Sequence, residues 1–404
     1  MRAVVTGLGA VSPVATGVEQ HWSGVLEGRG AIGPITRFDA SAYPVRAAGE
    51  ITDFDAAEHV SGRLIPQTDR VTRLTLAAAD WALAAAGVDM RERDPFDTSV
   101  VLANSIGGFE FGQKELENLW GSGPDHVSAY QSFAWFYAVN TGQVSIRHGM
   151  RGPVSVVVSD NAGGLDALGK ARRNIRRGTG LVVSGGMEAP LCPWGVAALS
   201  ADPGLSRATD PERAFLPFSA EAGGYVMGEG GAVLVVESEQ GARDRGARPL
   251  GEIAGHHQTF DPAPESGRGT RLEAAVRGAL ADAGLEPGAI DAVYADASGV
   301  PEADREESRA LEAVFGARGV PVTAPKTMTG RLNSGGGALD AAMALLSIRD
   351  GVLPPTAKGV AAAEEHALDL VTGQPRELEV RNVLVLARGH GGFNSAMVLT
   401  KSGR

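Results

Sequence analysis

Cysteine, aromatic residues and long apolar segments are scarce in this chain. The single cysteine, Cys192, excludes an internal disulfide framework and a zinc site built from cysteines, and we expect it to be inert packing. No apolar run approaches the roughly 18 residues that a membrane-spanning helix needs. The apolar run at the N-terminus is too short for a signal peptide, so the expected location is the cytoplasm.

Basic side chains are also in the minority. The 37 lysines and arginines are outnumbered by 48 aspartates and glutamates, and the net charge of −11 argues against nonspecific nucleic-acid binding. The histidines lack metal-ligand spacing, and the adjacent pair His256 and His257 would point to opposite sides of a strand. With 43% apolar residues and 55 glycines, the chain is predicted to be a soluble, closely packed protein without a metal or other cofactor.

The chain is organised around the stretch Pro153–Gly178. The run Val154–Val158 predicts a strand buried on both faces, and the small residues after it predict a sharp turn. A helix with one apolar and one cationic face is predicted over Leu165–Gly178. Such a strand–turn–helix element places Asn161 at the positive end of a helix, where many enzymes have a nucleophile. Here that position holds an amide.

The second half of the chain repeats the first, in the same order. The repeated helix–strand pairs are Thr68–Gly87 with Ser99–Ala103, and the helix ending at Gly284 with Ala292–Ala295. Strands that alternate with helices predict an α/β fold with mainly parallel sheets covered by helices. We therefore expect two similar halves, residues 1–241 and 242–404, stacked into one globule.

Three glycine-containing segments have simple interpretations. The segment Gly7–Ser12 lacks the third glycine of a dinucleotide-binding fingerprint and is predicted to be a tight turn. The segment Gly164–Lys170 lacks the serine or threonine of a phosphate-binding loop, and we expect a helix there. Gly389–Gly392 is expected to be the turn between the last two strands.

One basic cluster is predicted to be a solvated helix face, and the alternative is a docking surface for an acidic carrier protein. Its members are Arg172, Arg173, Arg176 and Arg177.

Seven longer motifs, spread nearly from end to end, point to a family. They are VTGLGAVSP, GGFEFGQKELENLW, SAYQSFAWFYAVNTGQ, VVSDNAGGLDAL, PGLSRATDPERAFLPF, APKTMTGRLNSGGGALD and ARGHGGFNSAMV. With these motifs the chain resembles the thiolase-fold ketosynthases, and more specifically the chain-length factor, or ketosynthase β subunit, of bacterial type II polyketide synthases. The resemblance implies a thiolase-like fold in which two duplicated αβαβα halves form a five-layered globule.

The resemblance also implies that the condensing residues are missing. Catalytic members use a cysteine and two histidines, and this chain has Asn161, Asp296 and Arg331 at the matching positions; only the lysine, Lys326, is retained. An amide is no nucleophile at neutral pH, and Arg331 is permanently charged and transfers no proton. An ionised Asp296 only accepts hydrogen bonds, so it could not donate to a thioester carbonyl. We predict that this chain does not condense acyl units.

Two further expectations concern these replacements. The replaced histidines share one site in the family, so we expect Asp296 and Arg331 to lie within the usual ion-pair limit of about 4 Å, with Asp160 as the rival partner of Arg331. Chain-length factors usually carry glutamine in place of Asn161, and that glutamine is credited with decarboxylating malonyl carrier protein into a primer. Whether the chain is an enzyme is therefore open: a decarboxylase that uses Asn161 is one alternative, and a purely structural partner is the other.

The preferred interpretation is a non-condensing subunit that sets polyketide length. In the family, this subunit pairs with a catalytic ketosynthase α subunit, and the chain delivered by acyl carrier protein grows into a tunnel at their interface. The resemblance places a length gate on one face of a helix predicted over Phe109–Trp120, at Phe109, Gly112 and Leu116; the other interpretation of that face is an ordinary core stripe. Expected partner contacts are Tyr130, Trp135, Phe136, Tyr137, Val156 and Val158.

Overall fold

The structure, a computed structural model, describes residues 1–357 and 359–403. Two halves of similar architecture lie side by side, and their strands form one eleven-stranded sheet in the order β12-β10-β9-β14-β15-β8-β1-β7-β6-β4-β5. The halves meet where β1 pairs with β8 through Val4 with Glu252 and Val5 with Gly251. The predicted duplication into α/β halves is therefore present, and a short antiparallel pairing near the N-terminus joins the strands of one half to those of the other.

The strands of the first half are β1 (Ala3–Val11), β4 (Thr98–Ala103), β5 (Val154–Val157), β6 (Leu181–Glu188) and β7 (Gly230–Ser238). Those of the second half are β8 (Gly251–Phe260), β9 (Ala292–Tyr294), β10 (Pro321–Thr323), β12 (Asp369–Leu370), β14 (Asn382–Gly389) and β15 (Phe393–Thr400). Two small two-stranded sheets pair β2 (Ile32–Pro34) with β3 (Ala47–Gly49), and β11 (Val352–Leu353) with β13 (Arg376–Glu377).

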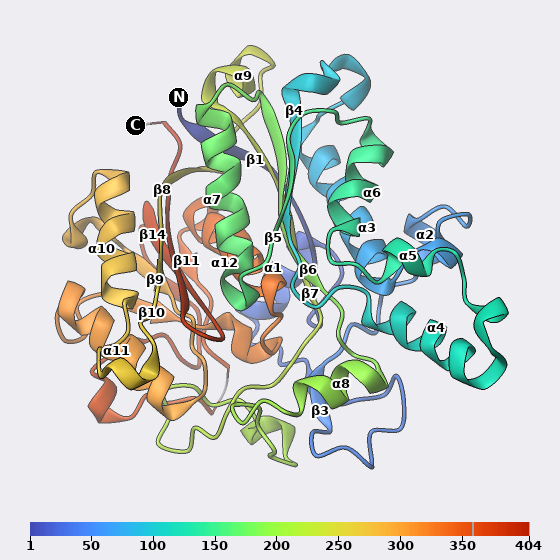
Figure 1. The fold of residues 1–404 in the computed structure, drawn as a ribbon. Coiled ribbons are helices and arrows are strands. Elements are labelled where there is room, and N and C mark those ends of the chain that lie inside the picture. Colours follow the sequence, from blue (N-terminus) through green and yellow to red (C-terminus); the bar gives the residue numbers. More distant parts are fainter. Residues whose placement is uncertain (358, 404) are drawn as a thin grey trace.

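The helices form three layers around these sheets (Figure 1). Between the halves lie α7 (Gly163–Arg176) and α12 (Ser334–Asp350). The first half is covered by α3 (Arg70–Ala86) and α6 (Val139–His148), and the second by α10 (Leu272–Ala283) and α11 (Pro301–Phe315). The remaining helices are α1 (Val18–Leu26), α2 (Ala56–His59), α4 (Phe109–Ser122), α5 (Gln131–Ala134), α8 (Pro193–Leu199) and α9 (Glu239–Asp244).

This arrangement gives the five layers that the resemblance implied. The central pair α7 and α12 is buried between two sheets, and α12 is apolar around almost its whole circumference, as a helix without a solvent face must be. The largest hydrophobic core joins this pair to both sheets, and two further cores lie under α3 and α10.

The prediction of a tight turn at Gly7–Ser12 is wrong, because β1 continues through Gly7 and Gly9 to Val11. Helix α3 crosses directly over these glycines: a Cβ atom at Gly7 would lie 2.1 Å from the carbonyl oxygen of Ala82. The second half has the same close approach, since a Cβ atom at Gly255 on β8 would lie 2.2 Å from the carbonyl oxygen of Ala279 on α10. Both glycines therefore allow a helix to pack directly against the backbone of a strand, and this contact occurs once in each half.

The prediction that Val154–Val158 is buried on both faces is also wrong. Strand β5 is the edge of the sheet, and among the described residues it pairs only with β4. The side chains of Val154 and Val158 are 43% and 49% exposed in the isolated chain. An apolar edge strand with an unpaired backbone is a surface suited to contact with another chain.

Smaller expectations are confirmed. Gly164–Lys170 lies within helix α7, and Gly389–Gly392 forms the turn between β14 and β15. Cys192 is buried, and burial raises the pKa of its thiol to about 11, which makes it unreactive. His256 faces α7, where it contacts Asp166, and His257 packs against Gly278 of α10 on the opposite side of β8.

Candidate functional site

Asn161 lies at the tip of the turn between β5 and α7, as predicted. The residue before it, Asp160, has a left-handed backbone with φ of 50°. Serine side chains hold this conformation from both sides: the Asp160 N–H donates to Ser105 Oγ at 3.1 Å, and Ser334 Oγ donates to the Asp160 carbonyl at 3.1 Å. A strained residue persists only where its surroundings determine it in this way.

The side chain of Asp160 fixes the amide of Asn161. Asn161 Nδ2 donates to Asp160 Oδ2 at 3.0 Å, and the backbone N–H of His390 donates to the same oxygen at 2.7 Å. A carboxylate only accepts hydrogen bonds, so the amide nitrogen must face Asp160. The turn that carries Asn161 is thus tied to the β14–β15 turn of the other half.

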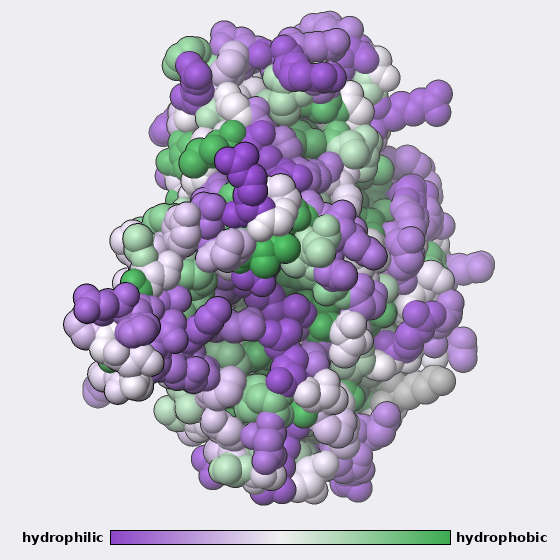
Figure 2. All heavy atoms as spheres, turned by 90° about the vertical axis from the view of Figure 1, so that its right-hand side faces the viewer, coloured by the Kyte–Doolittle hydropathy of each residue, from purple (hydrophilic) through white to green (hydrophobic). Residues whose placement is uncertain are grey.

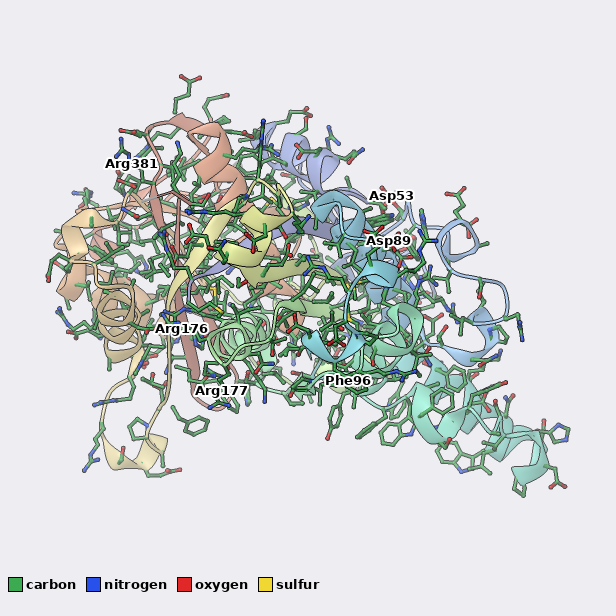
Figure 3. The ribbon with its side chains drawn as sticks, turned by 90° about the horizontal axis from the view of Figure 1, so that it is seen from above. Asp53, Asp89, Phe96, Arg176, Arg177 and Arg381 are labelled. Carbon is green, nitrogen blue, oxygen red and sulfur yellow. The ribbon has the colours of Figure 1, made fainter. Side chains whose placement is uncertain are left out.

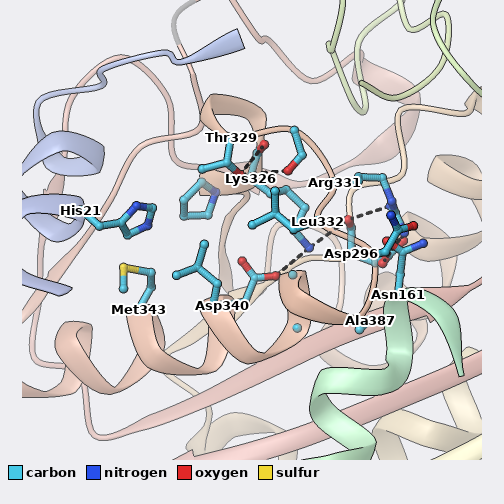
Figure 4. A pocket seen from close by; sticks show the side chains of 16 residues that line it. His21, Asn161, Asp296, Lys326, Thr329, Arg331, Leu332, Asp340, Met343 and Ala387 are labelled. Atoms are coloured by element: carbon cyan, nitrogen blue, oxygen red, sulfur yellow. Dashed lines mark hydrogen bonds and ion pairs between the residues drawn. The ribbon is translucent and has the colours of Figure 1, made fainter. Parts of the chain in front are cut away.

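Asp296 and Arg331 form the expected ion pair. Arg331 Nη1 lies 2.9 Å from Asp296 Oδ2, and Arg331 Nη2 lies 3.0 Å from Asp296 Oδ1, in a bidentate arrangement (Figure 4). Arg331 Nη2 also donates to the carbonyl of Arg388 at 3.0 Å, and the N–H of Arg388 donates back to Asp296 Oδ1 at 2.8 Å. The rival partner Asp160 is bonded to Asn161 and His390 instead.

Both members of the pair are buried and both are charged. Burial alone would raise the pKa of Asp296, but the charges of Arg331 and Lys326 outweigh it and hold that pKa below its ordinary value. Burial alone would lower the pKa of Arg331, but Asp296 raises it above the ordinary value of an arginine. Neither side chain can exchange a proton near neutral pH, as the histidines of a condensing enzyme must.

Two carboxylates on α11 position the loop that carries Asp296, and the sequence analysis missed them. Glu307 accepts hydrogen bonds from the N–H groups of Asp296 at 2.7 Å and Ala297 at 2.8 Å. Asp304 accepts one from Gly299 at 2.9 Å. Burial, with the nearby charge of Asp296, raises the pKa of Glu307 to about 7. The only signal in the sequence was their acidity within an otherwise amphipathic helix.

Lys326, which the resemblance matches to the lysine of the family, has three polar partners. Its Nζ atom donates to the carbonyl oxygens of Ala295 at 2.6 Å and Asp296 at 3.0 Å, and it lies 2.8 Å from Asp340 Oδ2 on α12 (Figure 4). The lysine therefore braces the Asp296 loop against the central helix.

Asn161 lines two spaces, a small cavity toward the protein interior and a wide groove open to solvent. The inner cavity, lined by Asn161, Lys326 and Met343 among others, has a volume of about 20 Å³. One water molecule needs roughly 10–15 Å³, so this cavity holds about one water and no acyl chain. On the outer side, Asn161 and His390 line an open groove of about 730 Å³.

The structure places two of the three predicted gate residues against one tryptophan. The ring of Phe109 on α4 stacks on Trp194 of α8, with centroids 4.7 Å apart and planes at 13°. A Cβ atom at Gly112 would lie 3.0 Å from Cζ3 of the same Trp194. Leu116 lies one turn further along α4 and is half-buried. Trp194 was not predicted, because only the fold brings α8 to α4.

The predicted partner contacts gather on exposed parts of the chain. Tyr130, Trp135, Phe136 and Tyr137 are each more than a third exposed, Val158 is exposed on the sheet edge, and Val156 is half-buried there. Figure 2 shows the face over α3 to α6 as mostly hydrophilic with separate hydrophobic patches. Exposed aromatic side chains on a globular protein are typical of surfaces that bind another protein.

The basic cluster is only partly a solvated face. Arg172 is buried and donates to Asp282 and to the carbonyl of Ala254, so for this residue the prediction is wrong. The side chains of Arg173, Arg176 and Arg177 are exposed. Figure 3 shows Arg176 and Arg177 close together, with Arg177 toward the same edge of the molecule as Phe96.

In the part of the chain that the structure describes, no helix is long and apolar enough to cross a membrane. Among the same residues, no three histidine, cysteine, aspartate or glutamate side chains are placed to hold a metal ion.

Comparisons with known proteins agree with the motifs. Models of the beta-ketoacyl synthase N-terminal and C-terminal domains match residues 1–242 and 250–359. The tetracenomycin polyketide synthase ketoacyl synthase beta subunit of Streptomyces glaucescens is 57% identical over 402 residues, which cover 99% of this chain and 98% of that protein.

Solved ketosynthase structures also match the chain over nearly its full length. The ishigamide ketosynthase/chain length factor matches with a TM-score of 0.91 and 27% identity, over 100% of this chain and 99% of that chain. A chain from a type II PKS acyl-carrier protein in complex with its ketosynthase bound to the hexaketide matches with a TM-score of 0.88 and 25% identity, over 99% of each. With family models over both halves and a relative of this identity over nearly its full length, the chain belongs to the beta-ketoacyl synthase family.

Proposed function

We propose that this chain is the non-condensing, chain-length-determining subunit of a type II polyketide ketosynthase heterodimer. The observation that carries the proposal is the buried, bidentate Asp296–Arg331 pair, which lines the same cavity as Asn161; the resemblance matches these three positions to the condensing residues of the family. These groups supply neither a nucleophile nor a proton donor, and the cavity behind Asn161 has no room for an acyl chain. The names of the relatives, a ketoacyl synthase beta subunit and a ketosynthase/chain length factor, support the same role.

The partner is a ketosynthase α subunit that carries the cysteine and histidines, and acyl carrier protein delivers malonyl units and the growing chain to the pair. The edge strand β5 and the exposed aromatic segment of residues 130–137 supply the surface that the partner covers. Helix α4 begins directly behind this segment: the N–H of Gly108 donates to the carbonyl of Trp135 at 2.9 Å. A tunnel at such an interface ends where Phe109 and Trp194 stack, and the volume of these side chains sets its depth.

The test is co-expression of this chain with a ketosynthase that has the cysteine and histidines. We expect a one-to-one complex that makes polyketide from malonyl carrier protein, with the acyl group attached only to the partner when intact subunits are examined by mass spectrometry. The matched variant Asn161→Cys returns a thiol to the turn. It is expected to remain without an acyl group, because the Asp296–Arg331 pair and the small cavity persist. An acyl group on the unaltered chain would overturn the proposal.

A further inference from the structure

Helix α4, which carries Phe109 and Gly112, begins without a capping side chain of its own. Its N-cap residue is Gly108, so no side chain at that position accepts a hydrogen bond from the first turn. The N–H of Phe111, the third residue of the helix, donates instead to Asp69 Oδ2 at 2.8 Å. Asp69 is distant in sequence, and it is the N-cap residue of α3.

Asp69 therefore caps two helices with one carboxylate. Its Oδ1 atom accepts from the N–H of Val71 in the first turn of α3 at 2.9 Å, while Oδ2 accepts from Phe111. The side chain is buried, and burial raises the pKa of the carboxyl to about 6. A buried carboxyl that serves two helix ends is costly to place, and nothing in the Asn161 site uses it.

No residue at position 108 could take over this function. A Cβ atom at Gly108 would lie 2.4 Å from the carbonyl oxygen of Ala134 and 2.9 Å from Cβ of Asp69. The first turn of α4 is thus enclosed between Asp69 on the core side and the Ala134–Trp135 backbone on the side predicted to face the partner. The loop before it is held as well, because Asn104 Oδ1 accepts from the N–H of Gly107 at 2.7 Å.

We propose that Asp69 is a positioning residue for the length gate: it fixes the first turn of α4 and so holds Phe109 in its stack with Trp194. Phe109 and Phe111 belong to the same helical turn, so loss of the bond to Phe111 frees the segment that carries the gate side chain. The C-terminal part of α4 projects from the globule, with Trp120 78% exposed (Figure 1). Contacts that hold the helix therefore lie in its N-terminal half, where Asp69 accepts from Phe111 and Gln113 Oε1 accepts from the N–H of Trp194 at 2.9 Å. This inference rests on the proposed function, in which α4 carries the gate.

The test uses the heterodimer made by co-expression, in the variants Asp69→Ala, Asp69→Asn and Phe109→Ala and the double variant Asp69→Ala/Phe109→Ala. Asp55→Ala is the matched control, since Asp55 caps α2 through a similar bond of 2.9 Å to the N–H of Ala57. Product lengths are measured by mass spectrometry, and protection of the α4 amides by hydrogen exchange. In Asp69→Ala we expect the Phe111 amide to lose about fivefold in protection, the usual effect of losing one cap.

The same variant is expected to make a broader range of product lengths, and Asp69→Asn, which keeps one acceptor, to recover part of the original distribution. In the Phe109→Ala background the Asp69 substitution should change length no further. The inference is overturned if Asp69→Ala speeds hydrogen exchange of the α4 amides but leaves the distribution of product lengths unchanged. It is also overturned if Asp69→Ala changes product length as much in the Phe109→Ala background as in the wild-type background. If Phe109→Ala alone leaves product length unchanged, α4 does not carry the length gate, and both that part of the proposed function and the present inference are overturned. If the Asp69→Ala variant does not form the heterodimer, product length and α4 hydrogen exchange are measured in Asp69→Asn instead, and the same outcomes apply.

Discussion

Asp296 and Arg331 hold each other through two hydrogen bonds of 2.9 and 3.0 Å, at the positions that the resemblance matches to the two histidines of condensing members. The pair adds no proton chemistry, but it joins the Asp296 loop to the end of β14 through Arg388. In the structure the pair therefore connects two segments of the second half. A buried ion pair of this kind stabilises little by itself, but either partner left alone is a buried, uncompensated charge.

Removing one partner of this pair is expected to destabilise the chain. Arg331→Met leaves Asp296 buried without the cation that is hydrogen-bonded to its carboxylate, which should lower the free energy of unfolding by about 3 kcal/mol, the low end of the usual range because the charge of Lys326 remains nearby. The double variant Asp296→Asn/Arg331→Met removes both charges, and its free energy of unfolding should fall much less than that of Arg331→Met. The measurement is chemical denaturation of the heterodimer in a double-mutant cycle at fixed concentration. If the losses of unfolding free energy in the two single variants simply add in the double variant, Asp296 and Arg331 do not interact and the ion pair is contradicted.

Phe109→Ala is expected to lengthen the polyketide. Truncation removes the ring that stacks on Trp194 and opens space at the proposed end of the tunnel. Chain length is read by mass spectrometry from the reconstituted heterodimer. Trp120→Ala is the matched control, because it removes an exposed aromatic ring from the same helix. Equal product lengths in wild type and Phe109→Ala would leave α4 as an ordinary core helix.

Asn161→Ala is expected to leave carbon dioxide release from malonyl carrier protein unchanged. The amide nitrogen of Asn161 is bonded to Asp160, and that carboxylate would repel both the malonyl carboxylate and the enolate formed from it. The assay follows acetyl carrier protein formed by the heterodimer whose partner cysteine is replaced by alanine. A clear fall in this rate in Asn161→Ala would instead support the decarboxylase alternative.

Glu188 is expected to contribute a loss of stability as the pH rises from about 5 to 8. Burial raises the pKa of Glu188 to about 8, well above that of an exposed glutamate. Between the two values the folded state binds a proton that the unfolded state has released, so the contribution is complete below the unfolded pKa and is lost as pH rises through the folded one. Thermal unfolding of Glu188→Gln across this range should show a flatter pH dependence than wild type. An equal slope in both proteins would rule this contribution out.

Val158→Asp is expected to weaken assembly with the ketosynthase α subunit. The substitution places a charge on the apolar edge of the sheet, which an interface would have to desolvate. Co-purification of a tagged partner measures the loss, and Trp120→Asp provides a control on a different exposed apolar side chain. Undiminished assembly would remove β5 from the proposed interface.

Several features followed from the sequence alone because they depend on local pattern and residue chemistry. The periodicity of apolar residues predicted α3, α4 and α7, and the order-preserving repeats predicted two α/β halves. The identity of Asn161 and Arg331 was enough to exclude a nucleophile and a proton carrier, since no surroundings give an amide or a guanidinium those properties at neutral pH.

Other features were decided only by the tertiary structure, because they depend on contacts between segments far apart in the chain. The valines of Val154–Val158 predict a strand equally well in the middle or at the edge of a sheet, and the strand order alone made β5 an edge. Gly7 resembled a turn residue until α3 was found to cross it. Trp194 meets Phe109, and Asp69 reaches Phe111, only after α8 and α3 have packed beside α4. Local pattern specifies the elements, whereas burial and polar pairing across those elements specify the site.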